Sequence, residues 1–353
     1  TNASWHSYAD HPWLAEIPDG QGVALAVDEP IHGGAATLST QSANPLAAYL
    51  KYRLNARFES MPEPFADAAW RGNLLHRALQ ALYQPLLGQD GMRIGLPADE
   101  DIPGAVETAL RSLHAFTRLT PIQYRAEQKR LTRVLQDWLE TERMRPPFRV
   151  IALEQELATE LLGHPIQLRL DRADELAPVG DAATHDAPEN PVLIIDYKSG
   201  KSDLGPWSKD RLGEVQLPLY ACSWQGAGTV TGLALARVKY GDIDVQGVVA
   251  DPDAAFGRVK TFGKSGAAIH KRFADWTEAL QSWRESIEQI AGEYIRGEAG
   301  NCNFDPNNYD VAELTPLLRL EEGAEWLRQH GVPVSAESDD DGEDSDYQEG
   351  ADS

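Results

Sequence analysis

The chain has 353 residues, of which 42% are hydrophobic, so it is long enough to bury a sizeable core. It has no apolar run approaching the roughly 20 residues that a membrane-spanning helix needs, and no charged-then-apolar N-terminal signal, so we expect a cytoplasmic protein. Its two cysteines, Cys222 and Cys302, exclude a disulfide framework and a metal site of four thiolates.

The net charge of −23 argues at first against a nucleic-acid partner, because Lys and Arg drive binding to phosphate backbones. The charge is uneven, however. Residues 337–353 hold nine acids and no base, which leaves −14 on the rest of the chain. Basic residues gather in two places, first at Arg125, Lys129, Arg130 and Arg133, and then at Lys198, Lys201, Lys209, Arg211 and Arg237. An acidic body with a basic groove would bind DNA weakly and in a salt-sensitive way.

Residues 1–37 lack clear periodicity, and we expect them to be the remnant of a preceding domain or a linker. One domain is predicted over 38–330, with a helical part at 38–147, a catalytic sheet and helices at 148–300 and a closing segment at 301–330. The acidic tail at 335–353 cannot bury enough apolar surface to order itself.

The first candidate ligand lies on the predicted helix RGNLLHRALQALY. Its buried face leaves His76 at the margin, and such a histidine is usually a packed or surface residue. Gly72 lies one turn earlier on the same face, where the missing side chain leaves room for another backbone or a phosphate. Carboxylates further along the chain favour a ligand role for His76. Two more predicted helices, 104–118 and 121–144, would form a cap beside the sheet, with basic residues facing DNA or solvent.

The pattern becomes β from Phe148. A strand over 150–161 contains Glu154, and after a turn at 163–165 a strand over 166–171 ends at Asp171. A polar loop over 175–190 leads to the next strand, so hairpin pairing would bring Asp171 and Asp196 together. Two like charges at close range raise each other's pKa, and a divalent cation removes that cost.

The run Val192–Ile195 is short and rich in β-branched residues, which favours a strand covered on both faces. At its end, period-2 geometry puts Asp196 and Lys198 on one side and Tyr197 on the other. A carboxylate and an ammonium so placed can hold a divalent metal and a positive charge beside one phosphate, as phosphodiester hydrolysis requires. Asp-x-Lys alone is a weak signal, and without other matching residues a solvated ion pair at a strand end is the favoured interpretation.

A helix follows in which Gln216 and Tyr220, four residues apart, share a face. Strands are then predicted at 230–240 and 243–249, a loop at 251–264 and one long helix at 267–296. The aromatic stripe of that helix indicates core rather than a platform for base stacking. No G-x-x-x-x-G-K-[ST] phosphate loop is present, so no ATP site is expected.

Taken in order, Gly72 and His76, Asp171, Asp196 and Lys198, and Gln216 and Tyr220 form the set GxxxH, D, DxK, QxxxY. This set resembles the nuclease domain of the RecB branch of the PD-(D/E)XK superfamily, most closely the C-terminal nuclease domain of AddB-like helicase-nucleases. The segment QSANPLAAYLKYRL is similar to the one that precedes the nuclease in those proteins. The resemblance implies an α/β, restriction-endonuclease-like core with a mixed central sheet flanked by helices, plus a helical cap.

The same resemblance implies metal-dependent hydrolysis of DNA in repair or recombination, by an exonuclease or an endonuclease. The implied ligands of Mg²⁺ or Mn²⁺ are His76, Asp171, Asp196 and the Tyr197 carbonyl, an oxygen-rich set that suits a hard cation. Lys198 would position or activate the attacking water, Gln216 would orient Lys198 or a phosphate, and Tyr220 would support the helix or touch DNA. Glu154 matches a glutamate often found near the metals, although a solvated strand face explains it nearly as well. The expected DNA contacts are Gly72, Arg172, Lys201 and Arg237.

Many of the similar proteins have an iron–sulfur ligand cysteine where this chain has Asn44, so no iron–sulfur cluster is expected. The implied partners are DNA with a single-stranded end and a helicase, either as a subunit or as a missing N-terminal region, with no membrane. The alternative is a catalytically inactive nuclease fold that binds DNA or scaffolds a helicase-nuclease complex. Inactive copies usually lose the Asp or the Lys of the DxK, and both are present here.

Overall fold

The computed structural model describes residues 20–57, 67–88, 96–114, 119–177, 190–200, 202–263, 267–305 and 308–319. Within these ranges six strands form one sheet in the order β1-β2-β3-β4-β5-β6. Their bounds are β1 Phe148–Leu161, β2 His164–Leu176, β3 Pro191–Lys198, β4 Thr229–Lys239, β5 Asp242–Val249 and β6 Arg258–Lys260. The pairs β3/β4 and β5/β6 are parallel and the other neighbours are antiparallel, so the predicted mixed sheet is confirmed.

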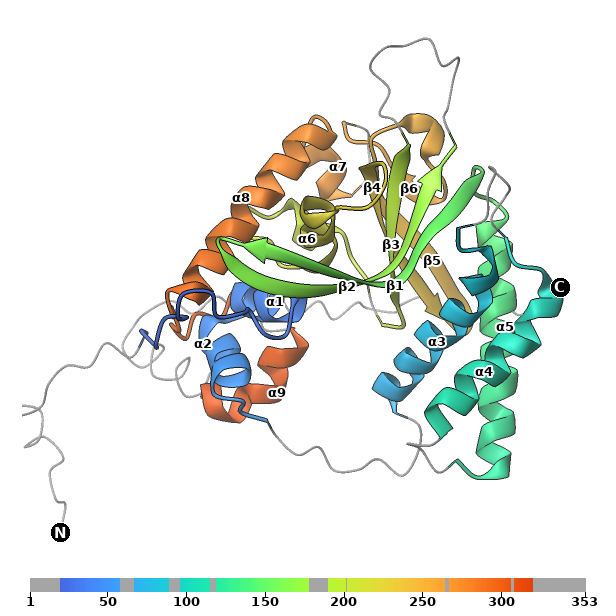
Figure 1. Cartoon of the computed structure of the whole chain (residues 1–353), viewed down its shortest axis with the longest axis horizontal. Coiled ribbons are helices and arrows are strands. Elements are labelled where there is room, and N and C mark those ends of the chain that lie inside the picture. Colours follow the sequence, from blue (N-terminus) through green and yellow to red (C-terminus); the bar gives the residue numbers. More distant parts are fainter. Residues whose placement is uncertain are drawn as a thin grey trace, which may run out of the picture.

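Helices cover both faces of this sheet (Figure 1). One face packs against α3, α4 and α5, and the other against α1, α6 and α8. The helices are α1 Ala35–Ala43, α2 Pro45–Ala48, α3 Ala68–Tyr83, α4 Ile102–His114, α5 Pro121–Glu142, α6 Gln216–Ser223, α7 Ala268–Arg272, α8 Trp276–Ile295 and α9 Tyr309–Leu318. The arrangement is α/β, with α3 to α5 as the predicted helical wall.

Strand β3 is buried from both sides, as its apolar run predicts. Val192 and Ile194 belong to the core under α6 and α8, whereas Leu193 and Ile195 belong to the core under α3 to α5. All four side chains are at most 1% exposed. The strand therefore fixes whatever stands at its carboxyl end on a rigid support.

Two predicted boundaries of secondary-structure elements are wrong. Strand β2 continues past Asp171 to Leu176, because its second half pairs with β3, so Asp171 lies inside the strand and not at its end. The helix predicted over 267–296 is divided into α7 and α8, since Phe273 takes an extended backbone and the Asp275 side chain caps α8 by accepting from the amide of Glu278. The stripe on α8 is core, as expected, with Trp283 1% exposed.

The segment 20–37 packs as part of the same domain, so the predicted boundary at residue 38 is wrong for these residues. The Leu25 amide donates to the Ile295 carbonyl at 2.8 Å, and the Ile31 amide donates to Pro165 at 2.8 Å. Leu25 and Ile31 both lie in the core beneath α8. The predictions for residues 1–19 and for the acidic tail lie outside the described residues.

Asn44 joins the start of the domain to its end. Its side-chain oxygen caps α2 by accepting from the Ala47 amide at 3.1 Å, and its amide nitrogen donates to Asn301 at 3.0 Å. Around it Ala43 and Ala47 pack against the apolar face of α9. Apolar contact and hydrogen bonds thus connect the two segments.

A buried network of charges lies between the sheet and α5. Arg172 pairs with Glu142 at 2.9 Å and with Asp174 at 2.7 Å, and Arg145 pairs with the same two acids at 2.7 Å and 2.9 Å. These four side chains are 0–1% exposed. Arg172 also donates to the Tyr197 hydroxyl at 3.0 Å. In the described part of the chain, no helix is long and apolar enough to cross a membrane.

Candidate active site

Three carboxylates come from neighbouring positions on three adjacent strands. In the β1/β2 ladder Leu153 pairs with Arg172 and Gln155 with Leu170, which places Glu154 opposite Asp171. In the β2/β3 ladder Arg172 pairs with Ile195, and continuing that register places Asp171 opposite Asp196. The predicted pairing of the Asp171 and Asp196 strands is therefore confirmed. The pairing also brings Glu154 into the same row.

Glu154 has an unusual backbone. Its φ of 45° lies in the left-handed region, which a non-glycine residue inside a strand rarely adopts. Its side chain is only 7% exposed, whereas that of Glu156, two residues on, is exposed. Strain of this kind concentrates at functional sites, where surrounding contacts hold it in place. The structure thus distinguishes Glu154 from a solvated strand residue.

His76, on α3, faces two of these carboxylates with one ring nitrogen. Its Nδ1 lies 3.4 Å from Glu154 Oε1 and 3.4 Å from Asp171 Oδ1. Its Nε2 lies 3.1 Å from the Tyr197 carbonyl oxygen, which can only accept, so Nε2 carries a hydrogen. Burial lowers the pKa of His76, but hydrogen bonds to Asp171 and Glu154 and the charges of both outweigh it and raise the pKa to about 10.

The three side chains fit a divalent cation. Within the described residues, His76, Glu154 and Asp171 each offer one ligand atom, and these atoms lie within 4.8 Å of one another. The two carboxylates suit Mg²⁺ or Mn²⁺, and a single imidazole beside them does not shift that preference to zinc. The Tyr197 carbonyl, predicted as a ligand, contacts Nε2 of His76, and a metal-binding histidine commonly donates its second ring nitrogen in this way. In this geometry Tyr197 orients the histidine, and its amide donates to Asp171 at 2.9 Å.

Asp196 lies beside this cluster and contacts Lys198. The ammonium of Lys198 is 2.8 Å from Asp196 Oδ2, and 34% of its side chain is exposed. Burial raises the pKa of Asp196 to about 7, with Lys198 acting to lower it and the charge of Asp171 to raise it. Burial lowers the pKa of Lys198, but the charge of Asp196 outweighs this effect and raises it, so Lys198 is a cation near neutral pH.

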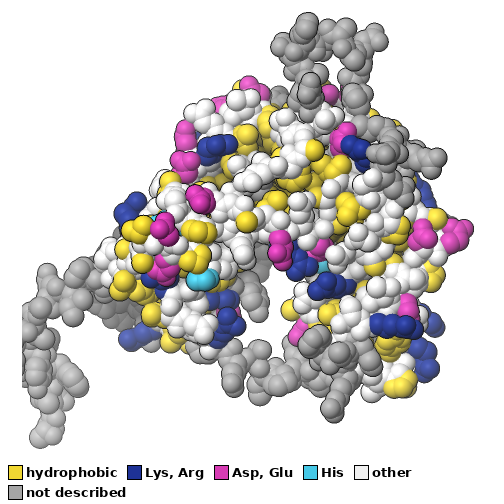
Figure 2. All heavy atoms as spheres, in the orientation of Figure 1, with side chains coloured by type: hydrophobic (Ala, Val, Ile, Leu, Met, Phe, Trp, Pro, Cys, Tyr) yellow, Lys and Arg dark blue, Asp and Glu magenta, His cyan; other side chains and the backbone are white. Residues whose placement is uncertain are grey.

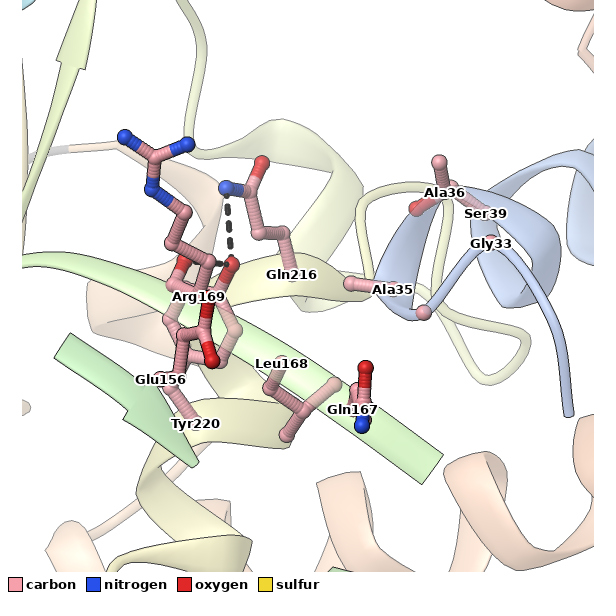
Figure 3. Close-up of a pocket in the computed structure, with 11 residues that line it drawn as sticks. Gly33, Ala35, Ala36, Ser39, Glu156, Gln167, Leu168, Arg169, Gln216 and Tyr220 are labelled. Carbon is pink, nitrogen blue, oxygen red and sulfur yellow. Dashed lines mark hydrogen bonds between the residues drawn. The ribbon is translucent and has the colours of Figure 1, made fainter. Parts of the chain in front are cut away.

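The Gln216 and Tyr220 pair on α6 forms a chain of hydrogen bonds across the site. Gln216 accepts from Lys198 at 2.9 Å and donates to Asp196 at 2.7 Å and to the Tyr220 hydroxyl at 3.1 Å. Tyr220 donates to the backbone oxygen of Arg169 at 2.6 Å, which connects α6 to β2 (Figure 3). Spacing of four residues on one helix turn makes this chain possible.

The residues predicted to contact DNA have different positions. Arg172 is 0% exposed within its ion pairs, so it cannot reach DNA, and its assignment as a DNA contact is corrected to a structural one. Arg237 stands next to Lys198 in the β3/β4 register and pairs with Asp242 at 2.9 Å. Gly72 is half-buried, and a Cβ there would meet Ser199 at 3.6 Å. Lys201 lies outside the described residues.

Arg169 is a site residue that the sequence analysis missed. Its guanidinium lies 2.5 Å from Glu154 Oε2, and 54% of its side chain is exposed. It also lines a pocket of about 450 Å³ together with Gln216, Tyr220 and residues 33–36 at the start of α1 (Figure 3). Arg169 and Asp171 are two residues apart on one strand, so their side chains point to the same face, and this spacing could have identified Arg169.

The site opens toward a hollow in the molecular surface. Figure 2 shows the surface hollowed between the α1–α2 side and the α3–α5 side, with basic, acidic and histidine side chains gathered where the sheet meets the hollow. The hollow thus reaches the charged side chains at this edge of the sheet.

The sequence matches the PD-(D/E)XK nuclease superfamily over residues 35–309, and the chain belongs to that superfamily. Its mixed sheet flanked by helices is the restriction-endonuclease-like fold of the superfamily. A search of curated proteins finds no match to the chain.

Proposed function

We propose that the protein is a divalent-metal-dependent DNA nuclease. The observation that carries the proposal is the row of Glu154, Asp171 and Asp196 on three adjacent strands, with His76 at one end and Lys198 at the other. The superfamily to which the chain belongs consists generally of nucleases, which supports the same activity. His76, Glu154 and Asp171 would hold Mg²⁺ or Mn²⁺, with Asp196 beside them.

The reaction breaks one phosphorus–oxygen ester bond by attack of water on phosphorus. When bound, the cation supplies Lewis-acid stabilisation of charge on the phosphate oxygens. Lys198 is a cation held at the rim of the site by Asp196 and Gln216, so it can position the water and offset the charge that develops on phosphate. Tyr220 secures Gln216 and thereby Lys198, while Gly72, Lys201 and Arg237 remain proposed contacts to DNA.

The ordered residues GxxxH, D, DxK and QxxxY support a finer proposal, that the chain is a RecB-branch, AddB-like nuclease. On this proposal it processes DNA ends in repair or recombination and works with a helicase that delivers single-stranded DNA. Exonuclease products from an end-labelled strand, compared with cleavage of a closed circle, would distinguish this role from that of an endonuclease.

The test is cleavage of labelled single- and double-stranded DNA in Mg²⁺, in Mn²⁺ and with a chelator. We expect cleavage only with a metal, and loss of cleavage in Asp171→Ala and Asp196→Ala. Glu160→Ala, an exposed acid on the same hairpin, is the matched control and should keep full activity. DNA binding without cleavage in either metal would favour the inactive, scaffolding alternative.

A further inference from the structure

Arg169 connects the candidate metal cluster with the pocket beside it. One oxygen of Glu154 faces His76 at 3.4 Å, and the other forms an ion pair with Arg169 at 2.5 Å. The guanidinium and a cation in the cluster would therefore share a single carboxylate. Because they carry charge of the same sign, each weakens the hold of that carboxylate on the other.

The side chain of Arg169 can leave Glu154 and bind a different partner in the pocket. It is 54% exposed, and it extends beside Gln216 along the wall of the pocket (Figure 3). A planar guanidinium that is half in solvent can turn between partners at little cost and can bind phosphate through two hydrogen bonds. Its backbone oxygen is fixed by Tyr220, so the side chain moves from a fixed base.

The pocket itself is suited to the backbone of a nucleic-acid strand. Its far wall is made by Gly33, Gly34, Ala35 and Ala36, which lack bulky side chains, and the pocket holds about 450 Å³. Glu156, directly opposite Arg169 across β1 and β2, is the one acidic side chain among its lining residues within the described part of the chain. The negative charge of Glu156 repels a phosphate and offsets the positive charge of Arg169. The pocket therefore attracts an anion only when a bound cation neutralises the acids beside it.

We propose that Arg169 couples metal binding to substrate binding: a divalent cation at Glu154 releases the guanidinium, which then holds a backbone phosphate of the DNA strand in this pocket. The inference rests on the proposed nuclease function and names a substrate-positioning residue of the same site. Metal and DNA should consequently bind with positive coupling, and by linkage each should tighten the other equally.

The experiment measures binding without turnover. In a Lys198→Ala background, affinity for a short single-stranded DNA is measured by fluorescence anisotropy with Mn²⁺ and with chelator, and Mn²⁺ affinity is measured by calorimetry. Adding Arg169→Gln should weaken DNA binding by about fivefold at 0.1 M salt in Mn²⁺, the loss expected for one phosphate contact. In chelator it should change DNA binding little, and it should leave Mn²⁺ binding as tight as before or tighter.

Two further variants sharpen the result. Glu156→Gln should tighten DNA binding without changing Mn²⁺ affinity. Arg149→Gln removes another cross-strand ion pair of the same hairpin, with Glu175, and should alter neither affinity. If Arg169→Gln weakens Mn²⁺ binding and leaves DNA binding unchanged in Mn²⁺, Arg169 merely supports Glu154 and the inference is wrong. A parent chain that fails to cleave DNA in any metal overturns the nuclease proposal, whereas this coupling is measured independently of cleavage.

Discussion

Replacing Glu142 by Gln is expected to destabilise the protein strongly, since Glu142 is one of two acids that neutralise two buried arginines. Its carboxylate pairs with Arg145 at 2.7 Å and with Arg172 at 2.9 Å, and it accepts from Tyr83 at 2.8 Å. In the variant, only the carboxylate of Asp174 would neutralise the two guanidinium groups, and the side chains of all three residues are 0–1% exposed. Removing one partner of a buried pair costs about 3–5 kcal/mol.

The matched control lies two residues earlier on α5. Glu140 pairs with Arg143 at 2.6 Å, but its side chain is 72% exposed. Exposed pairs contribute about 0–1 kcal/mol, so the free energy of unfolding of Glu140→Gln should be within about 1 kcal/mol of that of the parent. For a domain of this size a loss of about 3 kcal/mol lowers the melting temperature by about 6–12 °C. Urea unfolding followed by circular dichroism gives the free energies directly.

The pH dependence provides a second check. Burial raises the pKa of Glu142, but Arg145 and Arg172 outweigh it and hold the pKa below its usual range. A carboxylate with a lowered folded-state pKa stabilises the protein above its unfolded pKa of about 4.3 and loses that contribution as the pH falls through the folded value. The difference between parent and Glu142→Gln should therefore shrink below about pH 4. Equal unfolding free energies for the Glu142 and Glu140 variants at pH 7 would refute the reasoning.

Three other outcomes are expected. Lys198→Ala should reduce DNA turnover by about 100-fold while keeping Mn²⁺ affinity, because Lys198 acts on water and phosphate; turnover within a few-fold of the parent would contradict this role. Glu154→Gly should be more stable than Glu154→Ala by about 1 kcal/mol in thermal unfolding, since glycine accepts the positive φ, and both should lose Mn²⁺ binding in calorimetry. Burial raises the pKa of Cys222 to about 11, so iodoacetamide at pH 7.5 should react first with the exposed Cys302. Mass spectrometry measures the labelling of each cysteine, and equal labelling would contradict the burial of Cys222.

The residues at the end of β3 could be predicted because local geometry determines their relation. Period 2 in a strand places Asp196 and Lys198 together, and a spacing of four in a helix does the same for Gln216 and Tyr220. Predicting that Asp171 and Asp196 meet needed one further assumption, namely that the two strands carrying them pair. The structure has all of these contacts.

Long-range contacts and backbone strain could not be predicted in this way. Nothing local in the sequence indicates that Arg172 pairs with Glu142, which is distant along the chain and belongs to a different layer. A positive φ at a glutamate is likewise invisible, because no glycine marks it. The start of α8 was a different kind of error: Asp275, with Glu278 three residues later, is a helix-start signal that the aromatic periodicity hid.

The site draws on His76 from α3, two hairpin strands, β3 and finally Gln216 from α6, so its parts are separated by well over a hundred residues of chain. Contacts between such distant segments form late, because closing long loops costs entropy before any contact compensates for it. A nascent chain that has emerged only as far as β3 would lack Gln216 and the neighbouring strand β4. On the proposed function, the ability to cut DNA would therefore be acquired only in the last stages of folding, when Gln216 and β4 have joined the site.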